Sequence, residues 1–202
     1  MFKRKITNED APKDIVVETD IDLEMERLSA IKKDLNEERT KGSIAEFMEA
    51  ADNYGLSFLK EATFFDQEGK LVFKLSELIP EGYLIVEGAP LGRDFMNQHY
   101  KYIVLEEDFL QSVIGRFFAL HEISHARDFT EHPLTEDKEL SSDEDELQLV
   151  REGQAWKLAK GIIEDLKKKG MTWLPDSFLD SGEFERVVNF CLDYHKSLIK
   201  KV

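Results

Sequence analysis

The sequence predicts an α+β fold in which N-terminal helices precede a small, mainly antiparallel sheet and a helical half completes the chain. Three observations predict this order. Apolar residues recur at helical spacing near the N-terminus, short β-prone segments separated by turn residues fill the middle, and helical patterns return from about residue 109. With 202 residues and 42% hydrophobic content, the chain is large enough to bury a substantial core.

Two helices are expected after a polar, flexible arm at residues 1–17. The first is predicted over about 20–38 and ends before Gly42. The second ends before Gly55, so that the N-terminal helices occupy residues 18–55. Their apolar stripes are formed by Ile21, Met25, Leu28, Ile31 and Leu35 in the first helix, and by Ile44, Phe47, Met48 and Ala51 in the second.

The remaining elements follow from changes of period and from turn residues. Strands are predicted at 62–65, 71–75, 83–86 and 100–105, and helices at about 109–128, 144–168 and 183–201. An acidic segment at 131–146 separates the first two of these helices and contains eight acidic residues. We expect a solvated connector there, or alternatively a lid that repels acidic ligands.

The amino-acid composition limits the partners and the cellular compartment that we expect for this chain. The net charge of −15 argues against direct binding to nucleic acid and to anionic membranes, and it favours basic partners. The single cysteine, Cys191, excludes an internal disulfide and suits a reducing compartment, where we expect it to be a small core residue. The basic residues after Met1 are not followed by the apolar region of a signal peptide. No apolar run reaches the roughly 18 residues of a membrane span, so a cytoplasmic location is expected.

The most informative segment is His121-Glu122-Ile123-Ser124-His125, an H-E-x-x-H motif inside an apolar helical pattern. Histidines four residues apart project from one face of a helix and can bind the same Zn²⁺ ion. Glu122 is rotated by about 100° from His121, which places it beside the metal as a general base for the metal-bound water. The alternative is a buried helix that carries two hydrogen-bonded histidines.

The third ligand decides the class of site. Glu152 lies at helical spacing with Ala155, Trp156, Ala159 and Ile163, so its carboxylate is expected on a buried face, while Arg151 is expected to turn away. A buried carboxylate needs a cation, which is either the metal or a core-facing arginine or lysine. A second alternative is a metzincin-like site that uses Glu131 or His132, although Asp128 occupies the position of the glycine in that motif.

On these motifs the chain resembles the gluzincins, and among them the ImmA/IrrE-like peptidases. The matching residues are a strand at 102–105, His121-Glu122-Ile123-Ser124-His125, and Glu152-Gly153-Gln154-Ala155. The resemblance covers about residues 83–165. Ser124 stands where the family usually has glycine, and Trp156 stands where it usually has asparagine or aspartate.

The resemblance implies a zincin-like metallopeptidase domain over residues 56–202, with zinc held by His121, His125 and Glu152 and with Glu122 as the catalytic base. The expected partner is a peptide or protein substrate, with room for a regulatory protein partner. Zincins as a class pair an extended substrate with an edge strand, for which 100–105 is the candidate. Tyr194, His195, His99 and Tyr100 are candidate donors to the oxyanion.

Two other functions remain open at the level of sequence. A degenerate zincin would keep the fold and bind a partner without catalysis, but zinc binding alone does not require Glu122. A metal-dependent hydrolase of a substrate other than a peptide is the third alternative.

Overall fold

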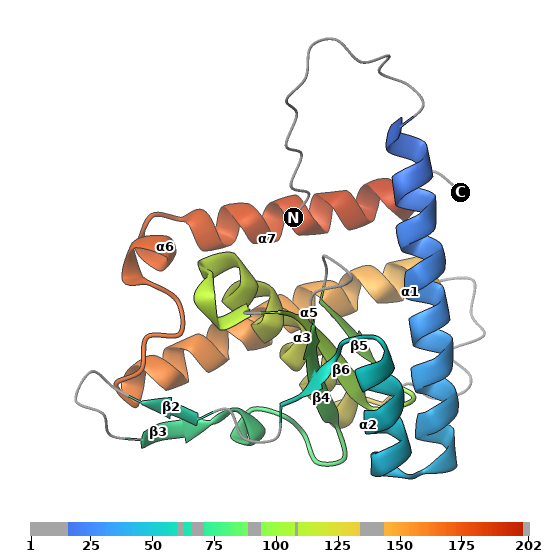
Figure 1. Cartoon of the computed structure of the whole chain (residues 1–202). Coiled ribbons are helices and arrows are strands. Elements are labelled where there is room, and N and C mark those ends of the chain that lie inside the picture. Colours follow the sequence, from blue (N-terminus) through green and yellow to red (C-terminus); the bar gives the residue numbers. More distant parts are fainter. Residues whose placement is uncertain are drawn as a thin grey trace.

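The computed structural model describes residues 16–59, 63–65, 71–88, 94–107, 109–133 and 144–199. The predicted α+β order is confirmed (Figure 1). The helices are α1 (Val16–Lys41), α2 (Ile44–Asn53), α3 (Val113–Glu131), α5 (Glu144–Lys168), α6 (Asp176–Asp180) and α7 (Glu183–Ile199). The strands are β1 (Ser57–Phe58), β2 (Thr63–Phe65), β3 (Leu71–Lys74), β4 (Leu84–Gly88), β5 (Phe95–Asn97) and β6 (Tyr102–Glu106). Short 3₁₀ helices, η1 (Leu75–Glu77) and η3 (Phe109–Gln111), precede β4 and α3.

The strands form a mixed four-stranded sheet in the order β1-β4-β6-β5, and β2 and β3 pair separately as an antiparallel ribbon. Within the sheet β4 and β6 run parallel, with Val86 opposite Val104, while both outer pairings are antiparallel. The expectation that the strand at 100–105 is an edge strand is therefore wrong, because β6 has a neighbour on each side. The edge next to it is β5, a three-residue strand too short to produce a recognisable alternation in the sequence.

The sheet separates two apolar cores. Along β6 the side chains alternate, so that Ile103 and Leu105 pack toward α3 and α5 while Tyr102 and Val104 pack toward α1 and α2. Figure 1 shows α1 and α2 on one side of the sheet and α3, α5 and α7 on the other. The core that contains α3, α5 and α7 is called here the site-side core, and the other the α1–α2 core.

Helix boundaries follow local chemistry. Gly42 and Gly55, with φ of +80° and +72°, end the first two helices in the left-handed conformation that glycine adopts without a steric penalty. Ser112 begins α3, since its hydroxyl accepts a hydrogen bond from the Gly115 amide at 2.7 Å. Within α5 the residues predicted to point inward are buried, because the apolar stripe and small alanines pack against α3.

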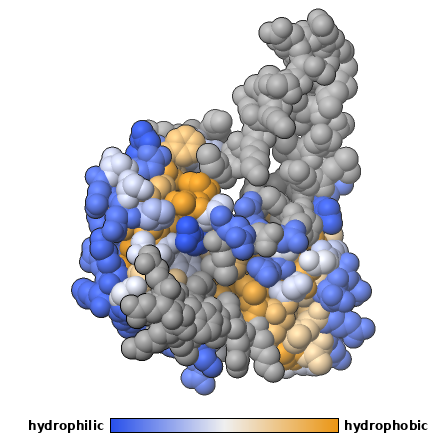
Figure 2. Space-filling view, turned by 60° about the vertical axis from the view of Figure 1, so that its left-hand side comes forward, coloured by the Kyte–Doolittle hydropathy of each residue, from blue (hydrophilic) through white to orange (hydrophobic). Residues whose placement is uncertain are grey.

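Figure 2 shows apolar side chains gathered in two areas of the face turned forward, with polar side chains between them. Large hydrophobic side chains are exposed at Ile44, Met48, Val150, Phe190 and Tyr194.

Among the described helices, none is both long enough and apolar enough to cross a membrane.

The predicted flexible arm lies outside the described residues up to residue 15, as does most of the acidic segment, residues 134–143.

Candidate metal centre

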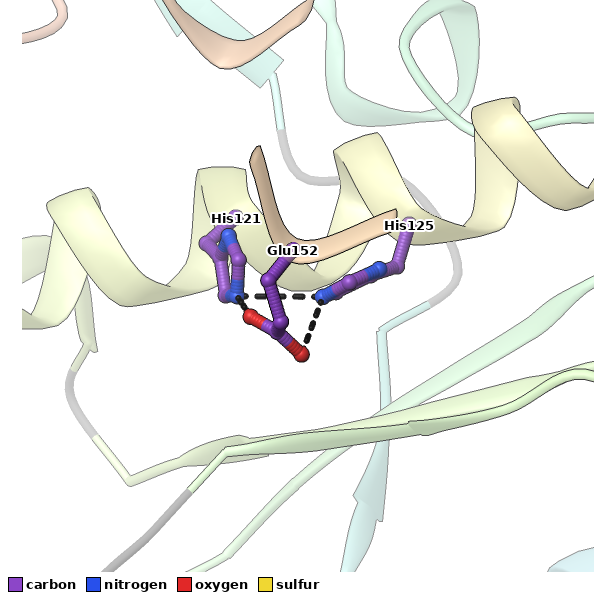
Figure 3. Close-up of side chains that lie close together, drawn as sticks. All are labelled: His121, His125 and Glu152. Carbon is purple, nitrogen blue, oxygen red and sulfur yellow. Dashed lines mark hydrogen bonds and ion pairs between the residues drawn. The ribbon is translucent and has the colours of Figure 1, made fainter. Parts of the chain in front are cut away.

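Helix α3 presents two histidines to the site-side core. His121 and His125 are one turn apart, both are buried, and their Nε2 atoms lie 3.1 Å from each other (Figure 3). Ser124 lies between them and donates its hydroxyl to the Leu120 carbonyl at 2.7 Å, so it leaves no unpaired polar group inside the helix packing. The helix therefore carries the pair as its spacing predicts.

Helix α5 brings Glu152 to the same point. Its Oε2 lies 3.1 Å from Nε2 of His121, and its Oε1 lies 3.3 Å from Nε2 of His125. The carboxylate can approach this closely because Ala155 and Ala159 are buried in the interface between the two helices. In Figure 3 the three side chains converge from the two helices on one point.

The three donor groups fit a zinc ion. Their donor atoms lie within 4.8 Å of one another, and the closest separations are 3.1, 3.1 and 3.3 Å. Zinc bonds of about 2.0–2.1 Å at tetrahedral angles place ligand atoms about 3.3 Å apart. Two imidazoles and one carboxylate also match the donor set of zinc sites that keep one position for water or substrate.

The surroundings of His121 and Glu152 favour the proton-free forms that bind a metal. Burial lowers the pKa of His121 to about 4, with repulsion from His125 as a second cause, so the imidazole is neutral at pH 7. Burial opposes ionisation of Glu152, but hydrogen bonds from His121 and His125 outweigh it and hold the pKa of that carboxyl well below its usual range. Burial also opposes the charged form of His125, yet the carboxylates of Glu152 and Glu122 raise its pKa overall.

The metzincin-like alternative is wrong for this chain. Glu131 and His132 are exposed at the end of α3, and His132 Nδ1 lies 3.2 Å from Asp128 instead of facing the cluster. Asp128 is buried and accepts a hydrogen bond from Arg151 at 2.8 Å. The prediction that Arg151 turns away is therefore wrong. Its ion pair with Asp128 joins α5 to α3 one residue before Glu152.

A salt bridge between Glu152 and a core-facing arginine or lysine is also not what the structure shows. In the described part of the chain, the partners of this carboxylate are histidines. The cation that a buried carboxylate requires is therefore supplied by imidazoles or by a metal that they share.

Glu122 is half-buried beside the two histidines, on the side that faces the sheet. Burial raises its pKa to about 7, and the amide of Met96 in β5 donates a hydrogen bond to its carboxylate. Two groups that the sequence did not indicate act on it electrostatically, Asp94 just before β5 and Lys32 of α1. Both come from segments distant in the chain, so no local pattern could have marked them.

Among the candidate oxyanion donors, the structure brings His195 to the cluster. Its Nε2 lies 3.6 Å from Oε2 of Glu152, and its side chain is half-exposed. Tyr194 is exposed next to it, whereas the Tyr100 backbone and side chain lie beside α1, and His99 contacts Gln98. A sequence signal for His195 does exist, since it continues the buried stripe of Phe184, Val188 and Cys191 along α7.

Cys191 packs half-buried against the site-side core, as expected for a small core residue.

Comparison of the chain with models of protein families, with curated proteins and with solved structures yields no match. The chemistry assigned to this centre therefore rests on its own residues and their geometry.

Proposed function

We propose that this chain is a zinc-dependent peptidase of the gluzincin type, in which His121, His125 and Glu152 hold the metal and Glu122 is the general base. The observation that carries this proposal is the convergence of the three donor groups beside a carboxylate that binding alone does not need. A bound zinc ion would supply an acidified water and a positive charge that polarises the scissile carbonyl.

Glu122 is suited to move the proton. A carboxyl with a pKa of about 7 is close to the pH at which a general base transfers protons most effectively. Its position one residue after His121 directs it to the edge of the cluster, near Met96 of β5. Only its ionised form can accept a proton, so the proposed role requires Glu122 to be deprotonated when substrate binds.

His195 is suited to stabilise negative charge on the substrate. Its imidazole stands next to Glu152 but remains partly open to solvent, which is where a substrate carbonyl would arrive. A donor on α7 opposite the two ligand-bearing helices would complete the surroundings of the developing oxyanion.

The substrate class that suits the surroundings of this cluster is an extended, basic peptide. Strand β5 is one edge of the four-stranded sheet, and Met96 of this strand lies near Glu122. An extended peptide adds to such an edge by backbone hydrogen bonds. The net charge of −15 attracts basic peptides and repels acidic ones.

The experiment that tests the function compares Glu122→Gln with wild type and with Glu131→Gln. The control makes the same chemical change on the same helix but at an exposed position away from the cluster. Zinc content would be measured together with the cleavage of basic, unstructured peptides, with the products identified by mass spectrometry.

We expect about one zinc per chain in all three proteins, and a loss of cleavage by at least about 100-fold for Glu122→Gln alone. In the same assay His195→Gln should lower kcat more than it raises KM, because its contact forms with the transition state. Equal cleavage by wild type and Glu122→Gln would contradict the assigned mechanism. Zinc binding without cleavage of any peptide by wild type would favour the degenerate, partner-binding alternative.

A further inference from the structure

Trp156 of α5 lies flat against the ring of His121. The ring centroids are 3.8 Å apart and the planes differ by 14°, while the indole also stacks on Phe117, one turn earlier on α3, at 4.5 Å and 27°. Trp156 is almost completely buried. The indole therefore covers one whole face of an imidazole whose edge belongs to the metal centre.

The other nitrogen of His121 lacks the usual support. Histidines that bind zinc generally donate their second ring N–H to a carboxylate, a carbonyl or water, and this hydrogen bond fixes the orientation of the ring. Nδ1 of His121 is buried, and within the described residues it has no hydrogen-bond partner. Stacking is thus the contact that defines the plane of this ring.

His125 provides the internal comparison. Its Nδ1 is also buried without a partner among the described residues, but its nearest aromatic neighbours are the His121 ring at 69° and Phe129, 6.4 Å away. No indole covers His125. The two ligands of the same helix are therefore held differently.

We propose that Trp156 is the positioning residue of the metal centre: by stacking on His121 it holds the imidazole with Nε2 toward the metal, in place of a hydrogen bond at Nδ1. The inference rests on the proposed metal site but not on catalysis. An imidazole bound to a divalent cation carries additional positive charge, and the face of an indole is negative, so the stack becomes more favourable when the metal is present. Trp156 thereby favours the metal-loaded state.

The test uses the full-length chain and its two tryptophans. Trp156→Leu removes the aromatic face, Trp156→Phe keeps a smaller one, and Trp173→Phe is the matched control in the same core. The control is suitable because Trp173 is buried and donates its indole N–H to the Arg116 carbonyl at 2.9 Å, away from the histidines. Zinc affinity would be measured by competition with a chromophoric chelator, after circular dichroism has established that each variant is folded.

We expect Trp156→Leu to weaken zinc binding by about 10–100-fold, the range seen when the supporting partner of a ligand is removed. Trp156→Phe should weaken it less, and Trp173→Phe should leave it unchanged. Wild-type affinity in folded Trp156→Leu would overturn the proposal.

A second measurement follows the fluorescence of each tryptophan separately and does not require the Trp156→Leu variant to fold. In Trp173→Phe, Trp156 is the single tryptophan, and binding of Co²⁺ should quench its fluorescence strongly, with excess Zn²⁺ restoring it. In Trp156→Phe, the remaining Trp173 should be quenched much less. Equal quenching in the two variants would count against the stack. If wild type binds neither metal, the metal centre itself is wrong, whereas metal binding that is indifferent to Trp156 rejects this inference alone.

Discussion

The two faces of the sheet bury very different chemistry. The α1–α2 core is made mainly of apolar side chains, and the hydroxyl of its buried Tyr102 donates a hydrogen bond to half-buried Asn36 at 2.8 Å. The site-side core contains the buried polar residues of the described chain, which are His121, Ser124, His125, Asp128 and Glu152. All of them lie on α3 or α5.

This difference separates what holds the fold from what forms the site. Burying imidazoles and carboxylates costs free energy unless each has a partner, whereas burying leucine and phenylalanine stabilises the fold directly. Asp128 and Ser124 find partners inside the protein, in Arg151 and the Leu120 carbonyl. The cluster of His121, His125 and Glu152 instead leaves two Nδ1 atoms unpartnered among the described residues.

The largest expected effect is the loss of metal binding when a donor of the cluster is removed. His121→Ala and Glu152→Ala should each weaken zinc binding by well over about 100-fold, more than the loss of a supporting partner would. Zinc at 100 times its Kd should stabilise wild type by about 2.7 kcal/mol and should not stabilise these variants. Calorimetric melting with and without zinc measures both effects.

His132→Ala is the control for that experiment, because it removes an exposed histidine that follows the end of α3. Loss of zinc in His132→Ala with retention in Glu152→Ala would reverse the assignment of the third ligand.

The opposite behaviour is expected in the α1–α2 core. Leu35→Ala removes a completely buried side chain and should cost about 2–5 kcal/mol of the free energy of unfolding, from lost burial and the cavity that remains. Zinc affinity of the folded variant should be unchanged. Urea unfolding and zinc titration together check this, and a variant that loses zinc while still folded would show that the two cores are coupled.

The smallest expected effect is a change in how the free energy of unfolding depends on pH, and it involves Asp94, which lies just before β5 in the sheet between the two cores. Burial raises the pKa of Asp94 to about 8, and the carboxylate of Glu122 contributes to the rise. The folded chain therefore binds more protons than the unfolded chain between about pH 4 and pH 8, so the free energy of unfolding should fall as the pH rises through that window. Asp94→Asn, which can still accept the Glu106 amide, should flatten this fall.

Chelator-treated protein unfolded by urea at pH 5 and pH 8 provides the measurement. Asp180→Asn, which removes an exposed charge on α6, is the control. If the free energy of unfolding falls equally steeply with pH in wild type and in Asp94→Asn, groups other than Asp94 cause the pH dependence.

Several elements were predictable because their signals are local. The bounds of α5 agree with the predicted 144–168, since the inward stripe of Glu152, Ala155, Trp156 and Ala159 repeats at helical spacing. Strand β5 and helix α6 were not predicted, because three and five residues are too few to show a period. The prediction that Arg151 turns away from the core is wrong for a different reason. The angular position of a residue around its own helix does not reveal that the end of α3 packs against the side of α5 that carries Arg151.

By itself, the sequence determined that His121, Glu122 and His125 share one helix turn and that Glu152 faces inward, because side-chain directions along a helix follow from its 3.6-residue period. Only the tertiary structure decided which strand forms the edge, that His195 reaches Glu152, and that Trp156 lies on His121. These contacts join residues on different helices and strands. Their geometry depends on how whole elements pack, which no local spacing encodes.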